Sequence, residues 1–183
     1  MKNKLIDDVG LILLGASIAA LVIFLVFFFS SPARAATIEA QRSLVPIDDV
    51  RVTLATLTNY NQPDPGPIQF YQGLHLGYAE DLESKQDFAF AGADLYARIQ
   101  GGNLWARWGL GISVFDRQTD ELSTPWDFHL SLVSGWDFGP WDFLMGIHHW
   151  SNGKGGADHI GIGNSWPANG GADAFMLGAA LKF

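Results

Sequence analysis

From residue 68 onward, hydrophobic and polar residues alternate in segments of about ten residues, the length of a strand tilted across a membrane. Successive side chains of a strand point to opposite faces, so this alternation predicts strands with one apolar and one polar face. In 104–114, apolar residues occupy the even positions from Leu104 to Val114, while Trp105, Arg107 and Ser113 fall on the other face. The pattern therefore predicts an all-β fold.

Turns and loops separate these segments. The predicted strands cover 70–79, 88–100, 104–114, 126–137, 141–151 and 173–183. Tight turns are predicted at 101–103 and at Gly139-Pro140, whereas 80–87, 116–125 and 153–171 are read as longer loops. Only in 88–100 is the apolar face ambiguous, because Phe88 and Phe90 oppose Ala89, Ala91 and Leu95.

Upstream of residue 68 the pattern is weaker, but it leaves room for two more strands. Residues 51–58 alternate as one strand and 37–44 as a weaker one, and the three prolines in 61–67 predict a loop because proline cannot donate to a strand ladder. Eight strands form the smallest common membrane barrel, which fills its interior with its own side chains. We therefore expect a small antiparallel transmembrane β-barrel of eight strands, without a pore.

A soluble β-sandwich alternates in the same way and is the competing interpretation. Polar residues opposite the apolar stripes favour the barrel, because a membrane barrel has a polar interior. These residues are Arg107, Asp127, His129, Asp142 and His148. Trp136 and Trp141 flank the 139–140 turn as an aromatic girdle would, and the terminal Gly178, Leu181 and Phe183 resemble the assembly signal of outer-membrane proteins.

Residues 1–35 are interpreted as a secretory signal peptide that precedes a single barrel domain at 36–183. Lys2 and Lys4 come before the apolar run 9–29, and Ala33-Arg34-Ala35 offers a small-x-small cleavage site. The apolar run is also long enough to cross a bilayer as a helix, so an uncleaved anchor is the alternative.

Charge and composition exclude several classes of partner. The chain has a net charge of −8 at pH 7 and contains no cysteine. An acidic surface argues against nucleic acid and against a polybasic lipid-binding patch. Without cysteine, neither a disulfide framework nor a cysteine-based metal site is available. We expect no cofactor.

Candidate chemistry lies near the end of the chain. His149 and Ser151 share the parity of the apolar residues in 141–147, and Asp173 shares the parity of the apolar residues in the last strand. If these strands pair as a hairpin, the three side chains meet at its loop end, where a nucleophile, its base and an orienting acid are needed together. Polar side chains on a lipid-facing stripe destabilise the protein unless they lie at the interface, which favours a functional role.

The run His149-Trp150-Ser151-Asn152, followed by 169–173 and a short terminal strand, resembles the outer-membrane lipid A 3-O-deacylases. The resemblance implies a bacterial outer-membrane serine esterase that removes an ester-linked acyl chain from lipid A or lipopolysaccharide in the outer leaflet. It assigns the catalytic triad to His149, Ser151 and Asp173, where Asp173 replaces the family's usual Glu. It assigns oxyanion or substrate binding to Asn152 and Asn169. The backbone N–H groups of Gly153 and Gly155, in the glycine-rich loop that follows, are further candidates for this role.

Three alternatives remain open. Outer-membrane phospholipases A carry a similar His-x-Ser-Asn-Gly run, and Asn164 would complete their triad; that family forms a calcium-dependent dimeric barrel larger than residues 36–183 can build, which argues against it. The oligomeric state of this chain is left open, with a homodimer as one alternative. A non-enzymatic structural barrel would use 153–171 only as an extracellular loop. A metal site at His149, Asp158 and His159 is the weakest alternative, because the spacing matches no established ligand pattern.

Overall fold

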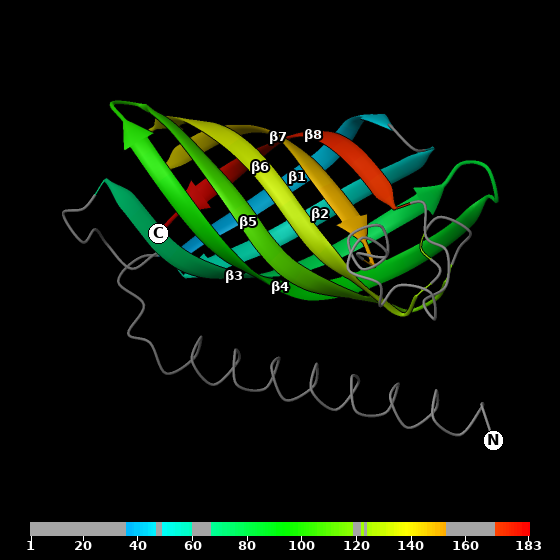
Figure 1. The fold of residues 1–183 in the computed structure, drawn as a ribbon. Helices are drawn as coiled ribbons and strands as arrows, with labels where there is room; N and C mark the ends of the chain where they lie inside the picture. The colour runs from blue at the N-terminus through cyan, green and yellow to red at the C-terminus, as the bar shows by residue number, and fades with distance from the viewer. Residues whose placement is uncertain (1–35, 47–48, 60–66, 119–121, 123, 153–170) are drawn as a thin grey trace, which may run out of the picture. The chain divides into compact units, whose positions relative to one another are not determined.

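The computed structural model describes residues 36–46, 49–59, 67–118, 122, 124–152 and 171–183, most of which lie in strands (Figure 1). The strands are β1 (Ala36–Pro46), β2 (Val50–Asn59), β3 (Ile68–Asp81), β4 (Gln86–Gly101), β5 (Leu104–Phe115), β6 (Trp126–Phe138), β7 (Trp141–Ser151) and β8 (Ala172–Lys182). Within this part of the chain, no helix is long and apolar enough to cross a membrane. The predicted signal peptide, 1–35, lies outside the described residues.

The eight strands close into an antiparallel barrel, which confirms the predicted fold class. Each strand pairs with the next one in sequence, and β1 pairs with β8. The seam continues past the last strand, because the backbone N–H groups of Ala36 and Phe183 each donate to the carbonyl oxygen of the other residue at 3.0 Å. Closure leaves no strand edge unpaired, as a membrane barrel requires.

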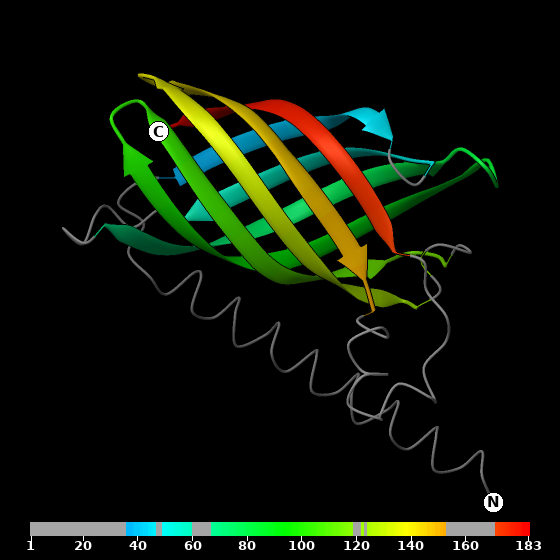
Figure 2. The same cartoon turned by 45° about the horizontal axis from the view of Figure 1, so that its top comes forward.

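The two ends of the barrel differ. The two-residue turns at 102–103 and 139–140 lie at the same end as Ala36 and the C-terminus, which we call the turn end (Figures 1 and 2). At the opposite end, which we call the loop end, β1, β3, β5 and β7 finish and β2, β4, β6 and β8 begin. The two longest intervals between strands, β5–β6 and β7–β8, fall at the loop end, although β1–β2 and β3–β4 there are short and β2–β3 at the turn end is longer than the two turns. Because short turns face the periplasm and the long loops face the exterior in outer-membrane barrels, we assign the loop end to the extracellular side.

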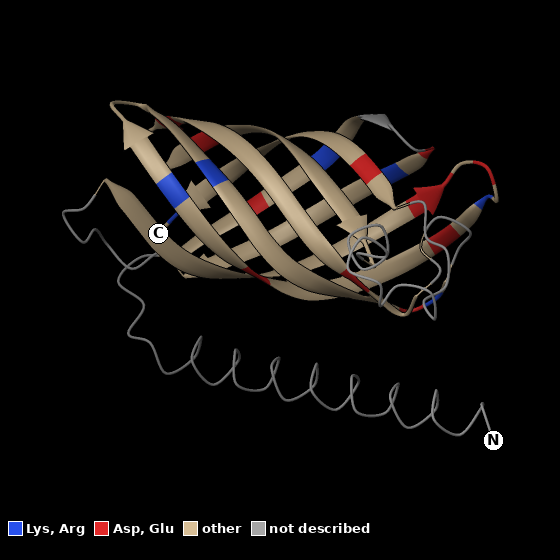
Figure 3. Cartoon of the chain, viewed as in Figure 1, with Lys and Arg blue, Asp and Glu red and all other residues tan. Residues whose placement is uncertain are grey.

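One predicted loop is shorter than expected. The sequence placed a charged loop at 80–87, but β3 and β4 continue until Asp81 pairs with Gln86. The turn is closed by Asp81, whose Oδ1 accepts the backbone N–H groups of Glu83 and Ser84 at 2.9 and 3.0 Å, while Lys85 takes a positive φ of 54°. Charged residues therefore prolong this hairpin at the loop end, where acidic side chains gather (Figure 3).

The two faces of the sheet separate as the alternation predicted. Large apolar side chains such as Leu76, Leu110 and Leu132 are exposed on the outside. The five polar residues expected inside are all at most 2% exposed: Arg107, Asp127, His129, Asp142 and His148. An apolar exterior and a polar interior suit a barrel surrounded by lipid.

The interior is not uniformly polar. Apolar side chains fill the loop end, including Phe88, Phe90 and Trp150, and a second apolar cluster around Trp105 and Leu144 fills the turn end. Polar residues lie between the two clusters. This arrangement explains the ambiguous segment 88–100, since its inward face changes along β4 from aromatic residues to Asp94.

The backbone seam at Phe183 leads to a prediction about assembly. Deleting Phe183 removes both hydrogen bonds to Ala36 at the end of the seam that closes the barrel, and closure satisfies the backbone groups of β1 and β8 in lipid. We expect the deletion to lower sharply the amount of heat-modifiable barrel in outer-membrane fractions on gels, while Ser151→Ala leaves that amount unchanged. Wild-type assembly of the deletion variant would contradict this account of the seam.

Candidate active site

His149 and Asp173 face each other across β7 and β8. The two residues are direct partners in the strand register, and His149 Nδ1 lies 2.7 Å from Asp173 Oδ1. Their side chains are 36% and 38% exposed, so the pair lies on the outer surface of the barrel and not in its interior. This contact fixes the orientation of the imidazole, because a carboxylate oxygen can only accept the Nδ1–H bond.

Ser151 is the last residue of β7 and lies on the same outward face as His149. It pairs with Phe128 of β6 and is partly exposed, as are His149 and Asp173. Two residues along a strand separate neighbouring side chains of one face, so Ser151 lies beside His149 at the loop end. The structure thus brings all three predicted triad residues to one patch.

Gly171 borders the same patch. Its φ is +78°, and a Cβ built on it would lie 3.2 Å from His149 Cε1, 3.5 Å from Ser151 Cβ and 2.9 Å from the carbonyl oxygen of Trp150. Glycine is required here both for the backbone conformation and for the close approach to β7. Sequence reasoning did not single out Gly171, because its proximity to His149 depends on the strand register.

The other predicted binding residues are only partly described. Asn152 follows Ser151 directly and is 2% exposed. Gly153 and Asn169 lie outside the described residues, as do Gly155 in the same loop, Asp158 and His159 of the alternative metal site and Asn164 of the phospholipase alternative.

The immediate surroundings on the outer face are apolar. Leu130 of β6 is the register partner of His149, and it is 46% exposed; Ile147, two residues before His149, is 49% exposed. The polar patch therefore lies at the loop end of an apolar surface. Such a position gives access to a polar headgroup region on one side and to hydrocarbon on the other.

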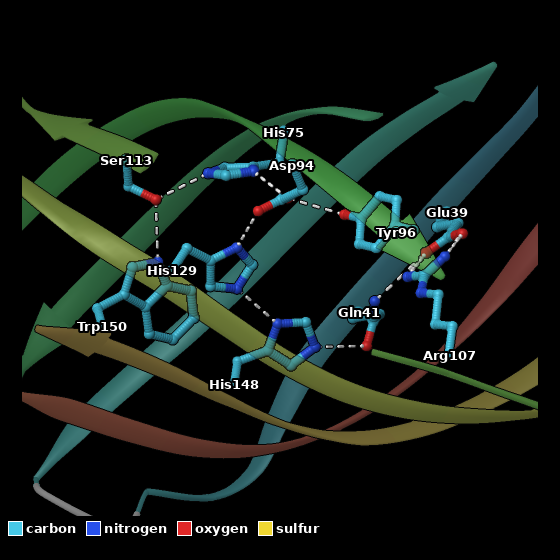
Figure 4. A network of polar contacts seen from close by, with 10 residues as sticks. All are labelled: Glu39, Gln41, His75, Asp94, Tyr96, Arg107, Ser113, His129, His148 and Trp150. Atoms are coloured by element: carbon cyan, nitrogen blue, oxygen red, sulfur yellow. Dashed lines mark hydrogen bonds and ion pairs between the residues drawn. The ribbon is translucent and has the colours of Figure 1, made fainter. Parts of the chain in front are cut away.

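Sequence reasoning missed a buried polar network below this patch (Figure 4). Asp94 lies at its centre, with Oδ2 at 2.7 Å from His75 Nδ1 and Oδ1 at 2.7 Å from His129 Nδ1. Tyr96 donates its hydroxyl hydrogen to the same carboxylate at 2.8 Å. The inward parity of His129 was visible in the sequence, but its convergence with β3 and β4 depends on the register of three strand pairs.

The centre of this network is also a group that could hold a metal ion. Ligand atoms of His75, Asp94 and His129 all lie within 4.8 Å of one another, and all three residues are buried. However, both Nδ1 atoms already bond the carboxylate, so the three residues satisfy one another as hydrogen-bond partners. The group is accounted for by hydrogen bonding within the barrel core.

A second buried pair fills the barrel towards the turn end. The Arg107 guanidinium forms two hydrogen bonds with the Glu39 carboxylate and lies 4.4 Å from the centre of the Tyr96 ring (Figure 4). Pairing in this bidentate manner satisfies two charges that burial would otherwise penalise strongly. The side chains of this pair are buried, whereas His149, Ser151 and Asp173 are partly exposed on the outer face.

Comparisons with known proteins agree with this architecture. The family profile for lipid A 3-O-deacylase (PagL) matches residues 48–165, more than half of the chain, including His149 and Ser151 but not Asp173. No curated protein matches the chain in sequence. The crystal structure of the outer membrane enzyme PagL is similar, with a TM-score of 0.59 at 14% identity, covering 79% of this chain and 98% of that one. The structural likeness supports the fold, and the profile match establishes the family: this chain belongs to the lipid A 3-O-deacylase (PagL) family of outer-membrane enzymes.

Proposed function

We propose that this barrel removes an ester-linked acyl chain from lipid A by a serine-esterase mechanism that uses Ser151, His149 and Asp173. The observation that carries the proposal is the 2.7 Å contact between His149 Nδ1 and Asp173 Oδ1, on the same outward face as Ser151. A histidine oriented by an acid beside a serine is the constellation that activates a hydroxyl for attack on an ester.

The protonation pattern follows from the hydrogen bond. With Nδ1–H donated to Asp173, the neutral imidazole has an unprotonated Nε2 that can accept the hydroxyl proton of Ser151. Ser151 Oγ then attacks the ester carbonyl carbon, and the proton passes through His149 to the departing alkoxide of the sugar. Water deprotonated by His149 attacks the acyl-enzyme, releases the fatty acid and restores Ser151. Asp173 stabilises the imidazolium in both steps.

The developing oxyanion needs hydrogen-bond donors. The family resemblance implies Asn152 and Asn169 for this role, and the backbone N–H of Gly153 is a further candidate from the glycine-rich loop. These assignments stay predictions.

An outward-facing triad suits a substrate that is itself part of the membrane. Leu130 and Ile147 expose apolar side chains next to His149, and acyl chains of an outer-leaflet lipid can pack against such a surface. The lipid then reaches Ser151 by lateral diffusion, and its ester bonds lie close to the headgroup region. No passage through the barrel is required, in agreement with its filled interior.

The 2.7 Å pair also favours this mechanism over the phospholipase A alternative. A phospholipase triad would recruit Asn164 as the partner of His149, whereas in this structure Asp173 bonds His149 Nδ1 directly. A single ring nitrogen faces that partner, so Asp173 and Asn164 would compete for the same position. We therefore favour lipid A as the substrate, and the oligomeric state stays an open prediction.

The triad is tested by following fatty-acid release from lipopolysaccharide by mass spectrometry with purified protein in detergent. We expect Ser151→Ala and His149→Ala to abolish release and Asp173→Asn to slow it by roughly three to four orders of magnitude, since an amide cannot hold the reactive tautomer. Asp173→Glu, which keeps a carboxylate, should retain part of the activity. Equal release by wild type and Ser151→Ala would refute the mechanism, and wild-type rates for Asp173→Asn would show that another group orients His149.

Gly171 provides a test of the geometry of the patch. An alanine at a positive φ destabilises the fold by roughly 1–2 kcal/mol wherever it occurs. At Gly171 the added methyl group would also press against Trp150 and His149, whereas Gly139 has the same φ of +78° and open space around its Cβ position. We expect Gly171→Ala to lower the rate of acyl release strongly and Gly139→Ala to leave it unchanged.

Thermal unfolding of both glycine variants serves as the control. Similar losses of Tm together with a loss of activity only in Gly171→Ala would support the proposed crowding of the site. Full activity in Gly171→Ala would place the reacting ester away from this side of His149.

A further inference from the structure

Trp150 lies between the two proposed catalytic residues of β7 and points the opposite way. His149 and Ser151 face outward, while the indole of Trp150 is 2% exposed and lies inside the barrel. The two peptide units of Trp150 link the backbones of His149 and Ser151. Any shift of Trp150 therefore moves both outward-facing side chains.

The indole N–H is held by a directional chain of hydrogen bonds (Figure 4). Trp150 Nε1 lies 3.1 Å from Ser113 Oγ, which lies 2.8 Å from His75 Nε2, and His75 Nδ1 lies 2.7 Å from Asp94. An indole can only donate and a carboxylate can only accept, so with a neutral His75, whose Nδ1–H faces Asp94, the chain has one polarity. Trp150 donates to Ser113, Ser113 donates to His75, and His75 donates to Asp94.

The ring faces of Trp150 are held as well. His129 stacks on the indole with ring centroids 4.8 Å apart and an interplanar angle of 11°, and Phe90 contacts the indole edge-on at 5.5 Å. His129 is itself oriented by its 2.7 Å contact with the second oxygen of Asp94. One buried carboxylate thus orients both histidines, and these restrain the N–H and the face of a single indole.

The hydrogen bond restrains Trp150 in a way that ring packing alone does not. Phe90 and Phe115 fill the same apolar cluster by ring packing and make no polar side-chain contact of this kind in the described structure. A hydrogen bond adds direction to the packing, because it fixes the rotation of the indole about its own axis. Fixing this rotation limits how the β7 backbone can move at its loop end, where the strand ladder stops.

We propose that Trp150 is a positioning residue for the deacylation reaction: anchored through Ser113, His75 and His129 to Asp94, it sets the placement of His149 and Ser151 on the outer face. The inference rests on the proposed triad. In this proposal, Trp150 keeps the nucleophile and its base in the correct relative position before substrate binds. This matters because small misplacements of reacting groups lower reaction rates strongly. Trp150 does not contact the ester, so we expect its substitution to lower kcat and not to weaken substrate binding.

Trp105 offers a matched control. It is also an inward-facing tryptophan, 4% exposed, and its indole N–H donates to Asp142 at the same distance of 3.1 Å. It lies at the turn end, remote from the triad. Trp105→Phe and Trp150→Phe therefore remove the same kind of hydrogen bond at opposite ends of the barrel.

The experiment measures kcat and KM for acyl release from lipopolysaccharide in detergent micelles, together with the rate at which a fluorophosphonate labels Ser151. We expect Trp150→Phe to lower kcat and the labelling rate about tenfold or more, with KM changed less than about twofold. Ser113→Ala, which keeps the indole, should reduce kcat in the same direction. The double variant should be little worse than Trp150→Phe alone, because both changes break one chain.

Trp105→Phe should leave kcat and labelling at wild-type values, while Tm reports the structural loss in every variant. If Trp150→Phe and Ser113→Ala lower Tm but keep wild-type kcat, Trp150 only fills the core and the inference is wrong. If Trp105→Phe lowers kcat as much as Trp150→Phe, the effect is general destabilisation and the inference is also wrong. Acyl release by Ser151→Ala would instead overturn the proposed function, so the two failures are distinguishable.

Discussion

Backbone hydrogen bonding in lipid is the constraint on which the rest of this structure depends. Hydrocarbon offers no partner for an N–H or C=O group, so the chain must satisfy every such group within the membrane by itself. The eight strands do so by closing on themselves, with β1 against β8 and Phe183 paired to Ala36 beyond the last strand. Closure then gives every strand one face towards lipid and one towards a narrow interior. Which of the two faces a side chain occupies determines whether a substrate can reach it.

The narrow interior makes the inside of the barrel a packed core. Apolar clusters close both ends, and between them buried charges are compensated by close partners, as for Arg107 with Glu39 and Asp94 with two histidines. These groups are buried, so a substrate cannot reach them without unfolding the core. The outer face at the loop end has the opposite properties: His149, Ser151 and Asp173 are partly exposed and next to apolar surface. A lipid is the type of substrate that such a surface favours.

The fold could be predicted from the sequence because each strand has lipid on one face and the barrel interior on the other. This difference requires apolar and polar residues to alternate along the strand. Leu110 must face lipid and Arg107 must not, so parity alone assigned them to opposite faces. Parity also put His149, Ser151 and Asp173 on one face, and the pairing of neighbouring strands through one loop placed His149 opposite Asp173. The 80–87 segment was misread because charge was taken as a sign of a loop, while beyond the membrane a strand ladder tolerates charged side chains on both faces.

Contacts across several strands could not be predicted in the same way. Asp94 meets His75 and His129 only because β3, β4, β5 and β6 have particular registers and the barrel curves them towards one another. An error of one residue in any of these pairings would turn one of these side chains to the outside. The close approach of Gly171 to His149 has the same origin, since its positive φ becomes meaningful only when β8 is placed beside β7.

Successive side chains of a strand point to opposite faces, and at the site this links the outer surface of the barrel to its interior. Along β7, His149 points out, Trp150 points in and Ser151 points out, so two exposed groups share a backbone with one side chain that is embedded in the core. A polar group on the outer face of a thin barrel has few neighbours to restrain it, because lipid and detergent give way. The interior is the densely packed part of the molecule and can hold a side chain in a single orientation. The buried network around Asp94 therefore restrains Trp150. The peptide bonds on either side of Trp150 in turn restrain His149 and Ser151 on the lipid-facing surface.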